Sequence, residues 1–155
     1  MVIEKLTNKY KDTYEYAHNL AKYLKKSDII FLTGDLGAGK TLFARGLCKG
    51  LGVQEEITSP TFNLLNVYQN TDKDLIVYHF DLYRLNRAEE LEDIGFNEYV
   101  YSTGISMIEW ADKFPEYLPD EYLLIEIEKT GENDRIIKLS FYGDRYENLG
   151  KEIDF

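Results

Sequence analysis

One segment of the chain combines the residue types and spacing that phosphate binding requires. The pattern G-x-x-x-x-G-K-[ST] is matched by Gly34-Asp35-Leu36-Gly37-Ala38-Gly39-Lys40-Thr41. Glycines let the backbone curl so that several N–H groups point at one anion, and the dipole of a following helix adds to that field. In such a loop Lys40 reaches the β- and γ-phosphates and the Thr41 hydroxyl binds Mg²⁺. The sequence therefore predicts a nucleoside triphosphate site.

The flanking residues support this interpretation. The apolar run 29–32 precedes the loop and the helix-compatible run 42–48 follows it, which is the strand, loop and helix order that the motif needs. A glycine-rich turn without a ligand is the plain alternative. A dinucleotide-binding turn fits less well, because the glycines fall as G-x-x-G-x-G and Lys40 stands where close helix packing is needed.

Two acidic residues close predicted core strands and are candidates for the remaining chemistry. Asp81 ends the run 75–81, and Glu109 ends the run 104–109. Carboxyl ends of strands in an open α/β sheet face the crevice where ligands bind, and nucleotide hydrolysis needs a carboxylate near Mg²⁺ and a group that orients water. The alternative is that both are ordinary strand-end acids solvated by water.

Three further segments need an interpretation. Thr61, with Ser59 as a weaker candidate, follows the phosphate-loop helix where switch threonines lie, although simple turn chemistry is the alternative. His79 precedes Asp81 by two residues and is expected to support Asp81 by hydrogen bonding. The segment 8–11 lacks the Asp of a guanine-reading N-K-x-D motif and lies before the phosphate loop, so we interpret it as surface.

The elements that must position these residues follow from periodicity and turn signals. Strands are expected over 2–6, 28–33, 62–68, 75–81, 104–109, 122–128 and 135–141. Helices are expected over 13–25, with a capping-box-like start at Asp12, over 40–51 and over 87–94. Pro60 makes 58–62 a loop. The turns 69–74 and 130–134 make two antiparallel hairpins, and the tail 143–155 is uninformative.

These elements define an expected fold class. We predict an α/β, P-loop NTPase-like three-layer sandwich with a mixed, centrally parallel sheet and antiparallel hairpins. With 155 residues, of which 44% are hydrophobic, the chain is expected to form a single domain over 1–155. The apolar runs are far shorter than the roughly 20 residues needed to cross a bilayer. The N-terminus does not resemble a signal peptide, so a cytoplasmic protein is expected.

Charge and cysteine content limit the possible partners. The net charge is −10 and the isoelectric point is near 4.7, so the protein surface is expected to repel nucleic-acid backbones. Any role in RNA chemistry is therefore expected to depend on a partner protein. The only cysteine, Cys48, lies in the helix after the loop and is interpreted as a buried, inert residue.

Five motifs together resemble the TsaE family, also called YjeE, small bacterial ATPases of tRNA threonylcarbamoyladenosine biosynthesis. They are the phosphate loop at 34–41, Ser-Pro-Thr-Phe at 59–62, His-Phe-Asp-Leu-Tyr-Arg-Leu at 79–85, Glu-Glu-Leu-Glu at 89–92 and Ile-Glu-Trp at 108–110. The resemblance runs from about residue 10 to about residue 135. It implies ATP and Mg²⁺ as cofactors and a complex of TsaD with TsaB as partner. That complex modifies adenosine 37 of tRNAs reading ANN codons, so tRNA would be contacted only indirectly.

The resemblance also implies roles for individual residues. Lys40 and Thr41 hold phosphate and Mg²⁺, Asp81 is the Walker-B-like acid, Glu109 binds Mg²⁺ or activates water, and Thr61 is the switch threonine. Trp110 lies beside the nucleotide, and Tyr10 and Gly131 align with further nucleotide contacts. Leu42 departs from the family, in which many members have a second threonine there.

Two other functions remain open at this point. A small-molecule or nucleotide kinase would share the loop, but it usually needs an arginine-rich lid, and the chain has no evident one. A nucleotide-gated binding module with negligible catalysis would differ only in degree.

Overall fold

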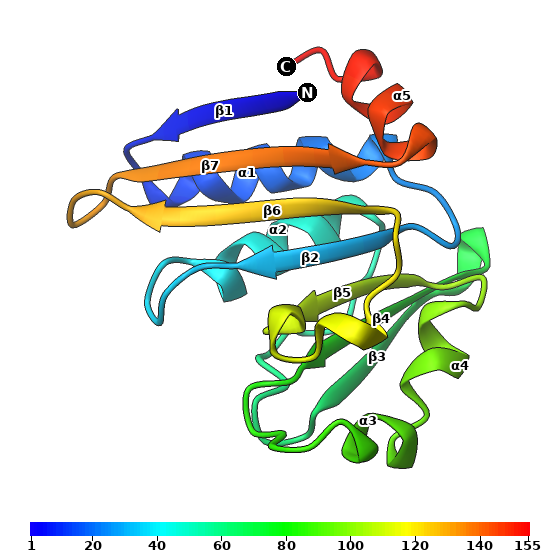
Figure 1. The fold of residues 1–155 in the computed structure, drawn as a ribbon. Helices are drawn as coiled ribbons and strands as arrows, with labels where there is room; N and C mark the ends of the chain where they lie inside the picture. The colour runs from blue at the N-terminus through cyan, green and yellow to red at the C-terminus, as the bar shows by residue number, and fades with distance from the viewer.

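A single mixed sheet of seven strands forms the centre of the molecule in the computed structural model, which describes residues 1–155 (Figure 1). The strands are β1 (Val2–Thr7), β2 (Ile29–Thr33), β3 (Leu65–Asn70), β4 (Leu75–Asp81), β5 (Ile105–Glu109), β6 (Tyr122–Lys129) and β7 (Arg135–Tyr142). Their order is β1-β7-β6-β2-β5-β4-β3. The central strands β6, β2, β5 and β4 are parallel, and the remaining pairs are antiparallel. The predicted mixed sheet with two hairpins is thereby confirmed.

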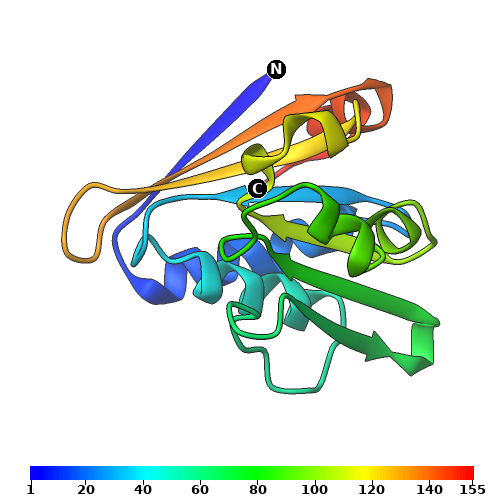
Figure 2. The same ribbon diagram turned by 60° about the horizontal axis from the view of Figure 1, so that its bottom comes forward.

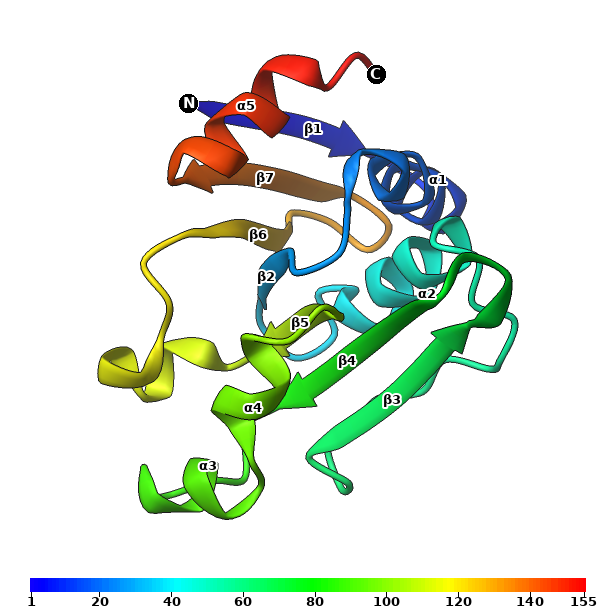
Figure 3. The same cartoon turned by 90° about the vertical axis from the view of Figure 1, so that its right-hand side faces the viewer.

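Helices cover both faces of the sheet. They are α1 (Tyr10–Leu20), α2 (Lys40–Gly50), α3 (Glu89–Asp93), α4 (Phe96–Val100) and α5 (Asp144–Glu152). Figure 3 shows α1 and α2 on one side of the sheet and α3 and α4 on the other. This is the α/β, three-layer arrangement that the sequence predicts. None of the helices is both long and apolar enough to cross a bilayer.

Strand β2 is buried on both faces, as expected for the centre of a parallel sheet. Ile30 and Leu32 belong to the core cluster that contains the residues of α1 and α2. Ile29 and Phe31 point to the opposite cluster, which contains the residues of α3 and α4. The loop that follows β2 is therefore attached to a strand whose first four residues are buried.

Two glycines let α2 lie close to α1. A Cβ added to Gly46 would collide with the Tyr14 carbonyl oxygen, and one added to Gly50 would lie 2.5 Å from the His18 carbonyl oxygen. The two glycines are four residues apart and share a helix face. Their missing side chains allow close helix contact, which fixes the position of the N-terminus of α2.

Several predicted boundaries differ from the structure. Helix α1 begins at Tyr10 with Lys9 as its N-cap and no side-chain cap bond, so the capping-box-like start at Asp12 is wrong and Asp12 lies within the first turn. The helix ends at Leu20 and continues as a 3₁₀ turn to Tyr23. Strand β3 begins at residue 65 instead of 62, because a turn covers 61–63 and Leu64 has φ +67°.

Two short helices have no sequence prediction. Helix α4 is a five-residue helix after Gly95, whose φ of +73° ends the preceding turn. Helix α5 occupies the tail that gave no signal, because its buried face consists of Tyr146, Leu149 and Gly150 and its other residues are polar. Its Tyr146 hydroxyl accepts a 2.7 Å hydrogen bond from the backbone N–H of Ile29, which attaches the tail to β2.

Candidate nucleotide-binding site

The loop between β2 and α2 has the backbone conformation that glycine favours. Gly34, Gly37 and Gly39 have φ values of +151°, +82° and +111°. A Cβ on Gly34 would lie only 2.6 Å from the Ile127 carbonyl oxygen of β6, whereas a Cβ on Gly37 would meet nothing within 4 Å. Glycine is thus required at position 34 both by the backbone conformation and by the lack of space for a Cβ. At position 37 it is required by the backbone conformation alone.

This contrast gives a stability prediction. We expect Gly34→Ala to destabilise the fold by about 3 kcal/mol, since a strained φ and a backbone clash add together. Gly37→Ala should cost only about 1 kcal/mol, because the strain of a left-handed residue acts there alone. Urea unfolding followed by circular dichroism measures both. Equal losses for the two variants would contradict the contact assigned to Gly34.

The two predicted acids lie side by side at the same edge of the sheet. Asp81 and Glu109 end the parallel strands β4 and β5 and are register partners, and Glu109 is also paired with Leu32 of β2. Both side chains are buried, with Asp81 3% and Glu109 4% exposed. The strand order thus brings residues that are far apart in sequence to the end of the phosphate loop.

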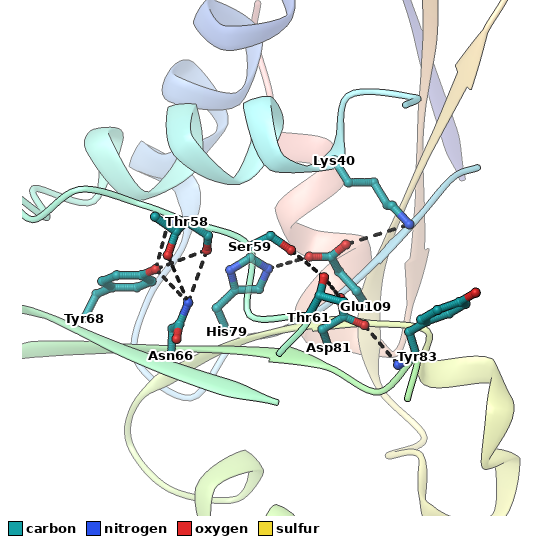
Figure 4. A network of polar contacts seen from close by, with 10 residues as sticks. All are labelled: Lys40, Thr58, Ser59, Thr61, Asn66, Tyr68, His79, Asp81, Tyr83 and Glu109. Atoms are coloured by element: carbon teal, nitrogen blue, oxygen red, sulfur yellow. Dashed lines mark hydrogen bonds and ion pairs between the residues drawn. The ribbon is translucent and has the colours of Figure 1, made fainter. Parts of the chain in front are cut away.

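Lys40 already faces this acidic edge. Its Nζ lies 3.8 Å from Glu109 Oε1 and 4.8 Å from the centroid of the Trp110 ring (Figure 4 shows the ion pair). Trp110 has φ +62°, a left-handed conformation that is uncommon for a bulky residue. The left-handed backbone directly after β5 places the Trp110 indole beside the Lys40 side chain.

Asp81 is connected to the predicted switch loop. Thr61 Oγ1 donates a 2.9 Å hydrogen bond to Asp81 Oδ2, and Ser59 Oγ lies 2.7 Å from Thr61 Oγ1. The backbone N–H of Tyr83 donates to Asp81 Oδ1 at 2.9 Å. The two switch candidates, Thr61 and Ser59, therefore belong to one hydrogen-bond network with Asp81, in which Thr61 contacts the acid directly (Figure 4).

His79 has a different partner from the predicted one. Its Nε2 lies 2.7 Å from Glu109 Oε2, and no bond joins it to Asp81. The expectation that His79 supports Asp81 is wrong, because the ring reaches across to the neighbouring strand β5, where Glu109 lies two residues beyond Met107, the register partner of His79. The ring is fully buried and its Nδ1 has no partner, so the ring presents a single hydrogen bond, to Glu109. An ionised Glu109 requires that Nε2 donate this bond.

A cavity of about 410 Å³ joins these groups. Of the predicted site residues, it is lined by Tyr10, Leu36, Gly37, Gly39, Lys40, Thr41, Leu42, Thr61, Asp81, Glu109 and Trp110. Gly34 and Asp35 border a smaller hollow that also touches Lys40 and Trp110. Ala38 and Gly131 line neither. A larger hollow of about 680 Å³ follows β1 and α1, but it contains none of the loop glycines, Lys40 or the two strand-end acids.

The sequence did not single out two residues of this cavity, Tyr83 and Arg135. Arg135 is 5% exposed and donates hydrogen bonds to carbonyl groups of the loop and of the β6–β7 turn. Tyr83 lies in the motif at 79–85, which pointed to Asp81 but gave the tyrosine no role of its own. Arg135 carries no sequence signal, because its hydrogen-bond partners are backbone atoms.

Cys48 lies outside this chemistry. It is fully buried on α2, and burial raises the pKa of its thiol to about 12. A thiol with so high a pKa stays protonated at neutral pH and is a poor nucleophile. The structure thus agrees with the interpretation of Cys48 as an inert core residue.

Fold and site together define the class of protein: an α/β chain with a P-loop-like fold, in which a glycine-rich loop, a lysine and two strand-end carboxylates meet in one cavity. The chain belongs to the TsaE family. The family model described as "Threonylcarbamoyl adenosine biosynthesis protein TsaE" matches residues 7–137.

Individual relatives agree with this assignment. The chain is 40% identical over 142 residues to the tRNA threonylcarbamoyladenosine biosynthesis protein TsaE of Bacillus subtilis, covering 92% of this chain and 87% of the relative. It is 41% identical over 129 residues to the protein of the same name from Treponema pallidum, covering 83% of this chain and 93% of the relative. A crystal structure of Bacillus subtilis YdiB matches with a TM-score of 0.84 and 34% identity, covering 98% of this chain and 93% of that one.

Proposed function

We propose that this protein binds and hydrolyses ATP and thereby supports threonylcarbamoyl modification of adenosine 37 in tRNAs reading ANN codons. One observation carries the nucleotide part of the proposal. Lys40, Asp81 and Glu109, from three separate segments, converge on the cavity next to the glycine-rich loop. The link to tRNA modification rests on family membership and on the names of the relatives.

The residues present fit a nucleotide with Mg²⁺. The loop supplies backbone N–H groups and the N-terminus of α2 for phosphate, and Lys40 supplies a cation. Thr41, Asp81 and Glu109 supply the oxygen ligands that Mg²⁺ prefers. No group of three or more His, Cys, Asp or Glu side chains is arranged to hold a metal by itself. Bound Mg²⁺ would neutralise charge on the phosphate oxygens.

Hydrolysis would depend on Glu109. Its buried carboxylate is oriented by His79 on one oxygen and faces Lys40 with the other. A carboxylate in this position can orient a water molecule and accept its proton as the water attacks the γ-phosphate. Thr61 would respond to the γ-phosphate through its bond to Asp81, giving the loop 58–62 two nucleotide-dependent arrangements.

A replacement of His79 tests its role in positioning Glu109. We expect His79→Phe, which keeps a ring in the buried site but removes the bond, to lower the ATPase rate by roughly 10–100-fold, as losses of orienting partners typically do. The affinity for ATP should change little. Ser106→Ala is the matched control, since Ser106 is also fully buried on a central strand and its hydroxyl has no partner. A His79→Phe enzyme with the rate of the control would contradict the positioning role.

The proposed partners are TsaD and TsaB. The net charge of −10 supports a model in which these partners hold the tRNA, because this chain would repel a phosphate backbone. The defining experiment measures ATP hydrolysis by the purified chain alone and with TsaD and TsaB of the same organism. A slow rate that rises with the partners supports the proposal. A partner-independent rate without a detectable complex would exclude the tRNA-modification role, and a phosphorylated metabolite would instead indicate a kinase.

A further inference from the structure

Arg135 is a buried cation without an anionic partner. Arg135 is the first residue of β7 and is 5% exposed, yet none of the ion pairs in the molecule includes it. All its hydrogen bonds go to carbonyl oxygens. Burying a guanidinium without a carboxylate is costly, so a specific role for the residue is expected.

The guanidinium joins two segments that are almost a hundred residues apart. Nε donates a 2.6 Å hydrogen bond to the Ala38 carbonyl oxygen, and Nη2 lies 3.5 Å from that of Gly37. Nη1 donates to three carbonyl oxygens of the β6–β7 turn, those of Gly131, Glu132 and Asp134. Figure 2 shows this turn at the same end of the sheet as the loop between β2 and α2.

These bonds determine which way the peptide groups of the loop point. A phosphate-binding loop works only if its N–H groups face the anion and its carbonyl oxygens face away, because a carbonyl oxygen repels phosphate. The carbonyl groups of Gly37 and Ala38 are held by Arg135 and are thereby kept from turning toward the phosphates. Glycine at 37 would otherwise allow this peptide to rotate, since its φ of +82° is one of several conformations open to it.

We propose that Arg135 is a positioning residue for nucleotide binding, which holds the phosphate loop in its binding-competent conformation by fixing the carbonyl groups of Gly37 and Ala38. The inference rests on the proposed nucleotide-binding function. The guanidinium also lines the cavity, so its uncompensated charge adds to the attraction for phosphate. Gly131 does not line the cavity, but its carbonyl group accepts a hydrogen bond from Arg135. Its connection to the nucleotide site would therefore be indirect, through Arg135.

The test compares the affinity for ADP, measured by calorimetry, of the full chain and of three variants. Arg135→Ala should raise the Kd by roughly 10–100-fold, the effect of losing hydrogen bonds from a charged group. Arg135→Lys keeps the charge but cannot span the loop and the turn, so it should recover only part of the affinity. Arg145→Ala is the control, since Arg145 is a partly buried arginine that pairs with Asp28 and lies on α5, outside the cavity.

A chemical rescue distinguishes positioning from general loosening of the fold. Guanidinium ion at millimolar concentration should restore ADP affinity to Arg135→Ala, whereas the same concentration of sodium chloride should not. Wild-type affinity in Arg135→Ala or in Arg135→Lys would overturn the proposal, as would an equal loss in Arg145→Ala or the absence of rescue. A wild-type chain that binds no ADP would instead overturn the proposed function.

Discussion

Lys40→Ala is expected to abolish tight nucleotide binding, with a rise in the Kd for ATP of about 100-fold or more. Truncating one member of a buried, charged contact typically costs 2–5 kcal/mol, and about 1.4 kcal/mol corresponds to a factor of ten. The structure adds a second cost. Lys40 lies 3.8 Å from Glu109, so its removal leaves the buried carboxylate with only its bond to His79 and facing the phosphates. Repulsion between the two anions would weaken binding further.

Calorimetric titration with ATP and with ADP measures this loss. Lys49→Ala is the matched control, because Lys49 lies on the same helix, is exposed and donates only to the carbonyl groups of Gln54 and Glu55. It removes the same charge from the molecule as Lys40→Ala. ATP binding that survives in Lys40→Ala at the level of the control would argue against any role of the loop as a phosphate site.

Glu109→Ala is expected to slow hydrolysis by about 10²–10⁴-fold, the usual contribution of a general base, while ATP binding is largely retained. The two effects separate because Lys40 and the loop remain in place. Glu109→Gln keeps the shape of the side chain and removes its charge, so the two variants together distinguish a proton acceptor from a space filler. Both should be slow if Glu109 acts as the base.

Single-turnover hydrolysis of bound ATP is the appropriate measurement, since it does not depend on product release. Glu4→Gln on the exposed edge strand β1 controls for the loss of one negative charge. Unchanged turnover in purified Glu109→Ala would remove Glu109 from the catalytic role. The search for the base would then move to Asp81, the other buried acid of the cavity.

The phosphate loop was predictable because everything that defines it is local. The motif consists of eight consecutive residues, and the runs on either side of it predict the strand and the helix. Asp81 and Glu109 were predictable for a related reason, since each closes a recognisable apolar strand and the strand ends of a parallel sheet meet at one edge.

Residues whose partners are distant or are backbone atoms were not predictable in the same way. The partner of His79 depends on which strand lies beside β4, and the sequence pattern does not give the strand order. Arg135 looks like any basic residue at a hairpin turn, because its hydrogen-bond partners are five carbonyl groups that no side-chain pattern marks. Helix α5 escaped prediction because two buried side chains on nine residues are too few for a periodic signal.

The strand order has a consequence for the growing chain on the ribosome. The two strands that form hydrogen bonds with β2 are β5 and β6, which begin at residues 105 and 122. The central strand and the loop that follows it are thus synthesised long before anything can pair with them. Until then, both edges of an almost entirely apolar strand are open to other chains, a state that favours aggregation. The centre of this sheet is therefore closed late, from the C-terminal half of the sequence.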